Sequence, residues 1–291
     1  MSPQSNGTSS SRRTFLKQSS AAVIGGTLAA TLGSARTAHA AGSDVLKVGL
    51  IGCGGRGKGA AVNAMKAEDN VCLTALADLF PDKLTEAKKI LSTNLGDKYQ
   101  VTDDCCFVGF DAYQKLIDTD VDVVLLATSP HYRPQHLRAA VDAGKHIFCE
   151  KPVAVDPVGV RSVLATSELA AKKGLNIVSG LCWRYDSAVR ETIGRIQDGA
   201  IGDIVAMQEN YLTGTLWERK REPEWSEMEY QNRMWLYYTW LSGDHIVEQF
   251  IHSLDKSMWL MDDQPPQSCV GLGGRQVRTD PTFGNIFDHH A

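Results

Sequence analysis

A glycine-rich segment directly after a short apolar run limits the possible folds of this chain more than any other feature. Leu46 to Ile51 is followed at once by Gly52-Cys53-Gly54-Gly55-Arg56-Gly57, and small apolar residues from Ala60 to Met65 then recur at helical spacing. Glycines in this pattern allow a tight turn and a close approach of the backbone to a pyrophosphate, which the start of a helix attracts. The pattern predicts dinucleotide binding at Gly52, Gly54 and Gly57. The alternative is a glycine turn that serves packing alone.

An acidic residue follows the second apolar run. Val71 to Ala77 ends in Asp78, about 20 residues after the glycines, where a carboxylate can accept hydrogen bonds from the adenosine ribose. A 2'-phosphate would meet this negative charge, so Asp78 favours NAD over NADP. NADP stays possible, because Arg56 or Lys83 could neutralise such a phosphate.

Short apolar runs continue to alternate with helical segments at Val121 to Ala127, His146 to Cys149 and Asn176 to Ser179. This alternation is typical of a parallel sheet with helices on both faces. After Gly180 the pattern changes to a helix and a longer strand, which we expect from Ile204 to Tyr211. We therefore predict an α/β fold. A doubly wound parallel Rossmann sheet occupies residues 41–180, and a second α/β domain with an open, mainly antiparallel sheet occupies residues 181–291.

The first forty residues have the layout of a removable export signal. Arg12-Arg13 precedes an apolar run from Ala21 to Gly33, and Ala38-His39-Ala40 provides a cleavage site. As a helix this run is about 20 Å long, shorter than a bilayer core of about 30 Å, so no permanent membrane span is expected. The arginines and Phe15-Leu16-Lys17 resemble a twin-arginine signal, whose pathway carries folded proteins. We predict that residues 1–40 contact the twin-arginine export machinery and that the protein is periplasmic; a disordered basic tail and a retained anchor are the alternatives.

Composition excludes several classes of protein. With 43% hydrophobic and 22% charged residues, the chain can form a packed core, which excludes a disordered or fibrous protein. The formal net charge is -4, although the first forty residues contain basic and no acidic residues. The remainder is thus more acidic than the whole chain, and no nucleic-acid partner is expected.

Two further motifs carry a family resemblance. Thr128-Ser129-Pro130-His131 follows the third apolar run, and Cys149-Glu150-Lys151-Pro152 ends the fourth. These motifs, with Gly199 to Ile204, resemble the glucose-fructose oxidoreductase, inositol dehydrogenase and rhizopine-catabolism (Gfo/Idh/MocA) oxidoreductases, of which Glu-Lys-Pro is the most specific mark. The resemblance implies a second domain whose open sheet closes the substrate cleft and forms oligomer contacts, hence a homo-oligomer. Residues 181–291 are fewer than that domain usually has, so a C-terminal truncation is expected.

The resemblance also implies roles for single residues. Thr128, Pro130 and Glu150 would contact the cofactor, and Glu150 would in addition maintain local structure. Lys151 would point at the substrate hydroxyl beside the nicotinamide. An ammonium there can stabilise a developing alkoxide or take part in proton transfer. The alternative is an ordinary surface lysine.

The segment from Asp244 to Met261 is predicted to form one amphipathic helix. Its apolar face carries Val247, Phe250, Ile251, Leu254 and Met258, and its polar face carries His245, Glu248, His252 and Asp255. The family resemblance implies an acidic residue and a histidine four positions apart, here Glu248 and His252. His252 would act as acid or base and Glu248 would orient it, although glutamate in place of aspartate leaves that role open.

Other interpretations of this polar face remain open. It could be a solvated helix face, or His245, Glu248 and His252 could bind a divalent metal. We predict no metal, because a lysine can supply the electrostatic role. Arg184 and Tyr185 are candidates for substrate binding at the rim of the cleft. The tryptophan-rich stretch from Leu216 to Trp240 would line a carbohydrate cleft or fill a core.

Together these features predict an exported NAD(P)-dependent oxidoreductase. It would transfer hydride between a tightly bound nicotinamide cofactor and a sugar, polyol or related hydroxyl substrate. An NAD-dependent glycosidase or lyase that uses transient oxidation is the alternative. A cofactor-binding protein without activity is the third possibility.

Overall fold

The computed structural model describes residues 45–214 and 216–291. The export signal predicted at residues 1–40 lies outside the described residues. The described residues form one compact unit, so contacts alone do not divide the chain near residue 180, and the domain boundary there stays a prediction. Within the described ranges, every helix is too short or too polar to span a bilayer.

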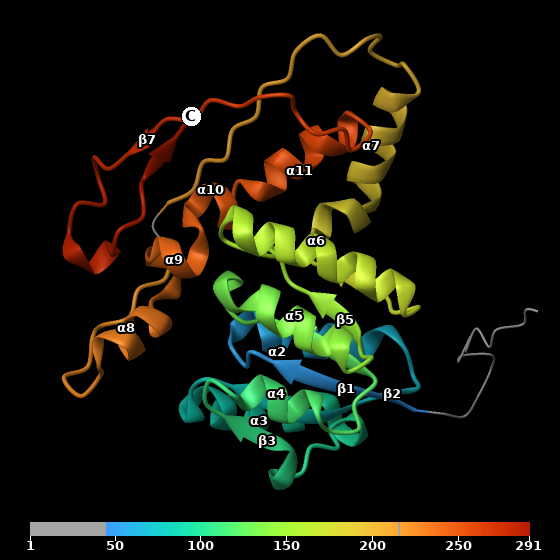
Figure 1. Cartoon of the computed structure of the whole chain (residues 1–291), viewed down its shortest axis with the longest axis vertical. Helices are drawn as coiled ribbons and strands as arrows, with labels where there is room; N and C mark the ends of the chain where they lie inside the picture. The colour runs from blue at the N-terminus through green and yellow to red at the C-terminus, as the bar shows by residue number, and fades with distance from the viewer. Residues whose placement is uncertain (1–44, 215) are drawn as a thin grey trace, which may run out of the picture. The chain divides into compact units, whose positions relative to one another are not determined.

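A six-stranded parallel sheet forms the first half of the unit (Figure 1). Its strand order is β3-β2-β1-β4-β5-β6, and every neighbouring pair is parallel. This is the Rossmann order, in which the chain winds outward in both directions from β1 and leaves a crevice between β1 and β4. The predicted Rossmann fold is therefore confirmed. The strands are β1 Leu46–Ile51, β2 Val71–Asp78, β3 Cys106–Val108, β4 Val123–Leu126, β5 His146–Cys149 and β6 Ile177–Ser179.

Five helices cover the two faces of this sheet. Met65, Leu84 and Leu91 place α2 and α3 against one face, whereas Leu116 and Leu137 belong to the core on the opposite face, which also includes α6. Helices cover both faces of the sheet and exclude water from them. The strands are therefore continuous apolar runs, without the alternation of apolar and polar residues that a half-exposed strand has. These helices are α2 Gly55–Ala67, α3 Pro81–Leu95, α4 Ala112–Ile117, α5 Arg133–Asp142 and α6 Pro157–Lys172.

The second half contains short helices and little sheet. The helices are α7 Ser187–Gln197, α8 Glu227–Arg233, α9 Thr239–Ser242, α10 Asp244–Glu248 and α11 Ile251–Leu260, and the strands are β7 Gly273–Gly274 and β8 His289–His290. Single 3-10 turns lie at Gly96–Lys98, Asp103–Cys105, Pro130–Tyr132, Cys182–Tyr185, Trp235–Tyr237 and Pro281–Phe283.

The strand expected from Ile204 to Tyr211 was a wrong prediction. No strand in the described ranges pairs with this segment, and the side chain of Val205 is 94% exposed. An isolated extended segment has no ladder hydrogen bonds and therefore does not count as a strand. The open antiparallel sheet expected for residues 181–291 is represented in the described part by β7 and β8 alone. In contrast, β3, which is only three residues long, was not predicted from the sequence.

The single helix expected from Asp244 to Met261 is broken into α10 and α11 at Gln249 and Phe250. The predicted faces are also reversed in part, because Asp255 is buried whereas Leu254 is 40% exposed. The reason is that the polar residues find partners inside the protein. Asp255 accepts hydrogen bonds from Arg184, and Glu248 accepts them from Lys151.

Candidate active site

The loop after β1 has the shape that a bound pyrophosphate requires. Gly52 has a φ of +99°, and a Cβ on Gly57 would lie only 1.8 Å from the carbonyl oxygen of Gly52. Both positions therefore demand glycine. A Cβ on Gly54, by contrast, would meet nothing within 4 Å, and Gly54 caps α2 without a side-chain hydrogen bond. The backbone N–H groups at the start of α2 are thus accessible to an anion.

Asp78 lies at the end of β2, beside this loop. Its Oδ2 accepts a hydrogen bond from the N–H of Cys53 at 2.6 Å, and its Oδ1 accepts one from the N–H of Phe80 at 2.9 Å. Burial raises the pKa of this carboxyl group, while the two backbone N–H groups act in the opposite direction. A carboxylate has further acceptor positions beyond these two bonds, so Asp78 can still receive a ribose hydroxyl.

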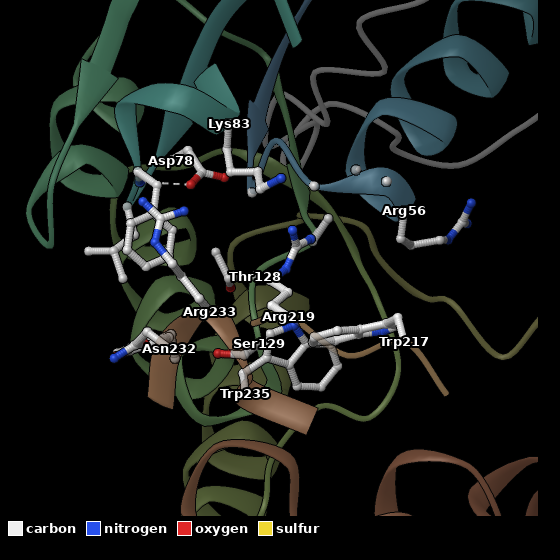
Figure 2. Close-up of a pocket in the computed structure, with 18 residues that line it drawn as sticks. Arg56, Asp78, Lys83, Thr128, Ser129, Trp217, Arg219, Asn232, Arg233 and Trp235 are labelled. Carbon is white, nitrogen blue, oxygen red and sulfur yellow. Dashed lines mark hydrogen bonds between the residues drawn. The ribbon is translucent and has the colours of Figure 1, made fainter. Parts of the chain in front are cut away.

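A cavity of about 470 Å³ extends over the loop and Asp78. In Figure 2, Asp78 and Lys83 lie on the side toward the sheet, and Trp217, Arg219 and Trp235 face them from the opposite side. The tryptophan-rich stretch was expected from the sequence to line a carbohydrate cleft or to fill a core. The structure places part of it at the cofactor cavity, and the interleaved arginines are the sequence feature that could have indicated this. Thr128, Ser129, Asn232 and Arg233 also line the cavity.

Arg233 joins the two sides of this cavity. Its Nη1 and Nη2 donate to the two carboxylate oxygens of Asp82 at 3.1 and 2.9 Å, and its Nε donates to Glu229. The guanidinium carbon lies 4.0 Å from the ring centroid of Phe80 and 4.6 Å from that of Trp225. A bidentate ion pair with two aromatic faces fixes the guanidinium in place.

Glu150 contacts the phosphate loop through the side chain of Arg56. The carboxylate is buried and accepts a hydrogen bond from Nε of Arg56 at 2.6 Å. Glu150 therefore holds the side chain of Arg56 in position. The close approach of Gly180, whose added Cβ would lie 2.7 Å from Oε2 of Glu150, leaves little space on the other side.

Thr128 and Pro130 lie in the segment after β4. Thr128 lines the cavity, whereas Pro130 is buried at the start of a 3-10 turn. Arg133, which was not predicted from the sequence, is buried and donates to the carbonyl oxygen of Thr128 at 2.6 Å and to that of Pro152 at 2.5 Å. Arg133 thus links the segment after β4 to the Glu-Lys-Pro segment after β5.

Lys151 lies directly after β5 and is largely buried. Its Nζ donates to the carbonyl oxygen of Glu248 at 2.5 Å and to Oε1 of the same residue at 2.8 Å. The two side chains are 17% and 14% exposed. The structure therefore brings Lys151 and Glu248 together, and the carboxylate of Glu248 pairs with the lysine where the sequence analysis expected it to orient His252.

His252 lies in the first turn of α11, near Lys151. Burial lowers the pKa of His252, and the positive charge of Lys151 lowers it further. Its Nδ1 is buried and has no hydrogen-bond partner in residues 45–214 and 216–291. The imidazole is consequently neutral at pH 7, the form that can accept a proton. The side chains of Lys151, Glu248 and His252 do not line the cofactor cavity.

Arg184 and Tyr185 were predicted at the rim of the substrate cleft. In the structure Arg184 is paired with acidic residues, and Tyr185 is exposed. Arg184 forms ion pairs with Asp255 and Asp263, which raise the pKa of its guanidinium, and its guanidinium carbon lies 5.1 Å from the ring centroid of Trp259. Tyr185 is 64% exposed. Arg184 is thus held by α11 and the turn that follows.

Residues 46–180 match the family described as "Oxidoreductase family, NAD-binding Rossmann fold", the Gfo/Idh/MocA family. Among curated relatives, glycosyl hydrolase family 109 protein 1 of Bacteroides fragilis is 30% identical over 58% of this chain and 35% of its own length. Inositol 2-dehydrogenase/D-chiro-inositol 3-dehydrogenase of Lactiplantibacillus plantarum is 28% identical over 75% of this chain and 53% of its own length. The chain therefore spans about a third to a half of the length of these relatives.

Solved structures share the fold. Scyllo-inositol dehydrogenase from Lactobacillus casei, with bound NAD(H) and scyllo-inositol, superposes with a TM-score of 0.53 at 22% identity, over 75% of this chain and 56% of that one. Aldose-aldose oxidoreductase from Caulobacter crescentus gives a TM-score of 0.58 at 21% identity, over 84% of this chain and 65% of that one. Residues 46–180 are thus similar to the NAD-binding Rossmann domain of the Gfo/Idh/MocA oxidoreductases, and the solved structures show the same fold.

Proposed function

We propose that the chain carries the cofactor-binding and catalytic residues of an exported NAD-dependent oxidoreductase, which transfers hydride between a tightly bound nicotinamide cofactor and a sugar, polyol or related hydroxyl compound. One observation carries this proposal: Lys151 pairs with Glu248 and lies near His252 at the carboxyl end of β5. The carboxyl ends of parallel strands share one edge of the sheet, and the loop after β1 that receives the dinucleotide lies at the same edge.

The three residues have complementary roles in this proposal. Bound oxidised nicotinamide supplies a hydride acceptor at its C4 atom. His252, neutral because of its lowered pKa, takes the proton of the substrate hydroxyl. The ammonium of Lys151 stabilises the negative charge that develops on the same oxygen. Glu248 holds Lys151 by two contacts and is therefore a positioning residue for the lysine.

The ion pair of Arg233 with Asp82 supports tight retention of the cofactor. It ties α8 to α3 beside the cavity, and we propose that the segment around α8 must move before the cofactor leaves. We expect Arg233→Met to raise the dissociation rate of NAD at least tenfold in stopped-flow fluorescence. Arg221→Met is the matched control, because Arg221 lies in the same segment, pairs with Glu227 and does not line the cavity. Equal dissociation rates in the two variants would contradict this retention.

A glycosidase or lyase with transient oxidation is the second candidate. It is favoured by the names of four curated relatives, which are glycosyl hydrolase family 109 proteins. In such chemistry a transient keto group acidifies the neighbouring C–H bond, and the cofactor returns to its oxidised form in every cycle. The same base and the same lysine serve both reactions.

One experiment separates the two candidates. The protein with bound NAD is incubated with myo-inositol, with other polyols and with 4-nitrophenyl glycosides. The dehydrogenase predicts one NADH formed for each keto product, whereas the glycosidase predicts release of nitrophenol without net NADH. If the cofactor binds but neither product forms, both enzymatic proposals are wrong.

Export through the twin-arginine route, a periplasmic location and a homo-oligomeric state complete the proposal. The paired Arg12 and Arg13, before the apolar run, support the first two. Replacing both arginines with lysine keeps the charge, so a general secretion signal would tolerate the change. We expect the double variant to remain in the cytoplasmic fraction and the unmodified protein to reach the periplasmic fraction. Equal distribution of the two would contradict this route.

A further inference from the structure

Two histidines and an aspartate that have no role in the proposed reaction lie close together. Asp244 and His245 begin α10, and His290 lies in β8. Oδ1 of Asp244 is 3.1 Å from Nδ1 of His245 and 3.4 Å from Nε2 of His290. The three ligand atoms all lie within 4.8 Å of one another, so segments far apart in the sequence present donors to one small volume.

These spacings suit a shared cation. Zinc bonds to histidine nitrogen and carboxylate oxygen are about 2.0 to 2.1 Å long, which places two ligand atoms about 3.3 Å apart at a tetrahedral angle. Both distances from Asp244 lie close to that value. The ligand nitrogens of the remaining pair, His245 and His290, lie within 4.8 Å of each other, and the two ring centroids are 4.2 Å apart.

His290 provides a second, independent observation. Its Nε2 is buried and makes no well-formed hydrogen bond to any residue of the described ranges; Oδ1 of Asp244 lies 3.4 Å away. Buried polar atoms in proteins nearly always have a partner, and those without one need an explanation. The lone pair of a neutral imidazole nitrogen is the commonest protein ligand for a zinc-class ion.

The backbone holds Asp244 in a conformation that presents its carboxylate. Its φ is +67°, a region that residues with a side chain seldom adopt and that persists only where the surroundings enforce it. The N–H of Asp244 donates to Oγ of Ser242, and Oδ2 of Asp244 accepts from the N–H of Phe287 at 2.9 Å. Oδ2 is engaged with the segment before β8, whereas Oδ1 accepts a hydrogen bond from the N–H of His245 at 2.6 Å and faces both imidazoles.

We propose that Asp244, His245 and His290 bind a divalent cation of the zinc class. Two imidazoles and one carboxylate favour Zn²⁺ or Co²⁺ over Mg²⁺ and Ca²⁺, which prefer oxygen ligands alone. This set differs from the one considered in the sequence analysis, because Glu248 is paired with Lys151 and only His245 is common to both. The cation would tie the segment of β8 to α10, the helix that ends at Glu248.

The test measures binding of Co²⁺ and Zn²⁺ to tag-free full chain that has been treated with a chelator. Co²⁺ is followed by its visible absorption, and Zn²⁺ by competition with Co²⁺. Because exposed thiols also bind these ions, the experiment uses a Cys182→Ser/Cys269→Ser background. His290→Gln and His289→Gln form a matched pair: the same substitution in adjacent histidines, of which only His290 belongs to the set.

We expect one cation for each chain in the background protein and in His289→Gln, and an affinity at least about tenfold lower in His290→Gln. Asp244→Asn provides a second variant that keeps an acceptor for the N–H of Phe287 and should bind as weakly. Zn²⁺ should raise the Tm of the background protein and of His289→Gln, and it should leave the Tm of His290→Gln and Asp244→Asn unchanged. The proposal is wrong if no saturable binding occurs, or if His290→Gln or Asp244→Asn binds as tightly as His289→Gln.

Discussion

Nζ of Lys151 lies 2.8 Å from Oε1 of Glu248 and 2.5 Å from the carbonyl oxygen of the same residue. The two residues are 97 positions apart in the sequence, and both side chains are largely buried. A buried ammonium needs such a partner, because an unpaired charge in the interior has a large desolvation cost. The pair therefore holds α10 against the end of β5 and fixes the direction of Lys151.

Glu248→Gln tests this role directly. The amide keeps an acceptor for Lys151 but removes the negative charge, so the contact loses part of the about 1.5 to 3 kcal/mol that a hydrogen bond to a charged group contributes. We expect kcat/KM for oxidation of a polyol to fall about tenfold or more, with the Kd of NAD unchanged. Glu191→Gln is the control, because Glu191 forms an exposed ion pair with Arg195 on α7. Equal activity of the two variants would show that the pair has no role in turnover.

The pH dependence of activity should reflect His252. Burial and the charge of Lys151 lower the pKa of His252 below 6.5, so the base stays neutral until the pH falls below that value. We expect the acidic limb of kcat/KM to have its midpoint below pH 6.5. In Lys151→Met, NMR titration should show the pKa of His252 moved upward, because one cause of the lowering is removed. A downward or absent change would contradict the proximity of the two groups.

Stability should also depend on pH, through His136. Burial lowers the pKa of His136 to about 3, and Tyr113 stacks on its ring at 4.1 Å. Below the unfolded value near 6.5 the unfolded chain binds a proton that the folded chain does not, so stability is full above pH 6.5 and falls as the pH decreases toward 3. The expected loss between pH 8 and pH 5 is about 2 kcal/mol.

Urea unfolding at several pH values measures this loss. His136→Phe keeps an aromatic ring beside Tyr113 and removes the titrating group, so its stability should change less between pH 8 and pH 5. His131→Phe is the control, because His131 is exposed on the preceding turn. If the two variants lose stability equally between these pH values, His136 is not the source.

Two glycines of the phosphate loop should differ in how alanine affects them. In Gly57→Ala the added Cβ would lie 1.8 Å from a backbone oxygen, so the loop must open, at a cost of about 1 to 3 kcal/mol or more, and NAD binding should be lost. In Gly54→Ala the added Cβ meets open space, so the Tm should be unchanged. The same Cβ obstructs the approach of the pyrophosphate, so NAD binding should weaken. Thermal unfolding and NAD titration measure both effects. Equal loss of stability in the two variants would contradict this difference.

Local patterns in the sequence determined the Rossmann half. Apolar runs such as Leu46–Ile51 and Val71–Asp78, with the glycine motif between them, are signals contained within a few residues. Each run is buried on both faces, so its composition alone indicates a strand. The three-residue β3 could not be predicted from the sequence, because so short an apolar run has no distinctive pattern. The Lys151 segment could be identified by resemblance, but its partner could not.

Only the tertiary structure decided which charges meet. Periodicity placed Glu248 and His252 on one helix face, but the helix breaks at Gln249 and the carboxylate pairs with Lys151. Arg233 reaches Asp82, 151 positions away, and Asp244 faces His290 across two separate segments. Such contacts depend on how distant elements pack, and the free energy of burying a charge selects its partner only after packing has brought the candidates together. A sequence read along its length contains the residues but not these distances.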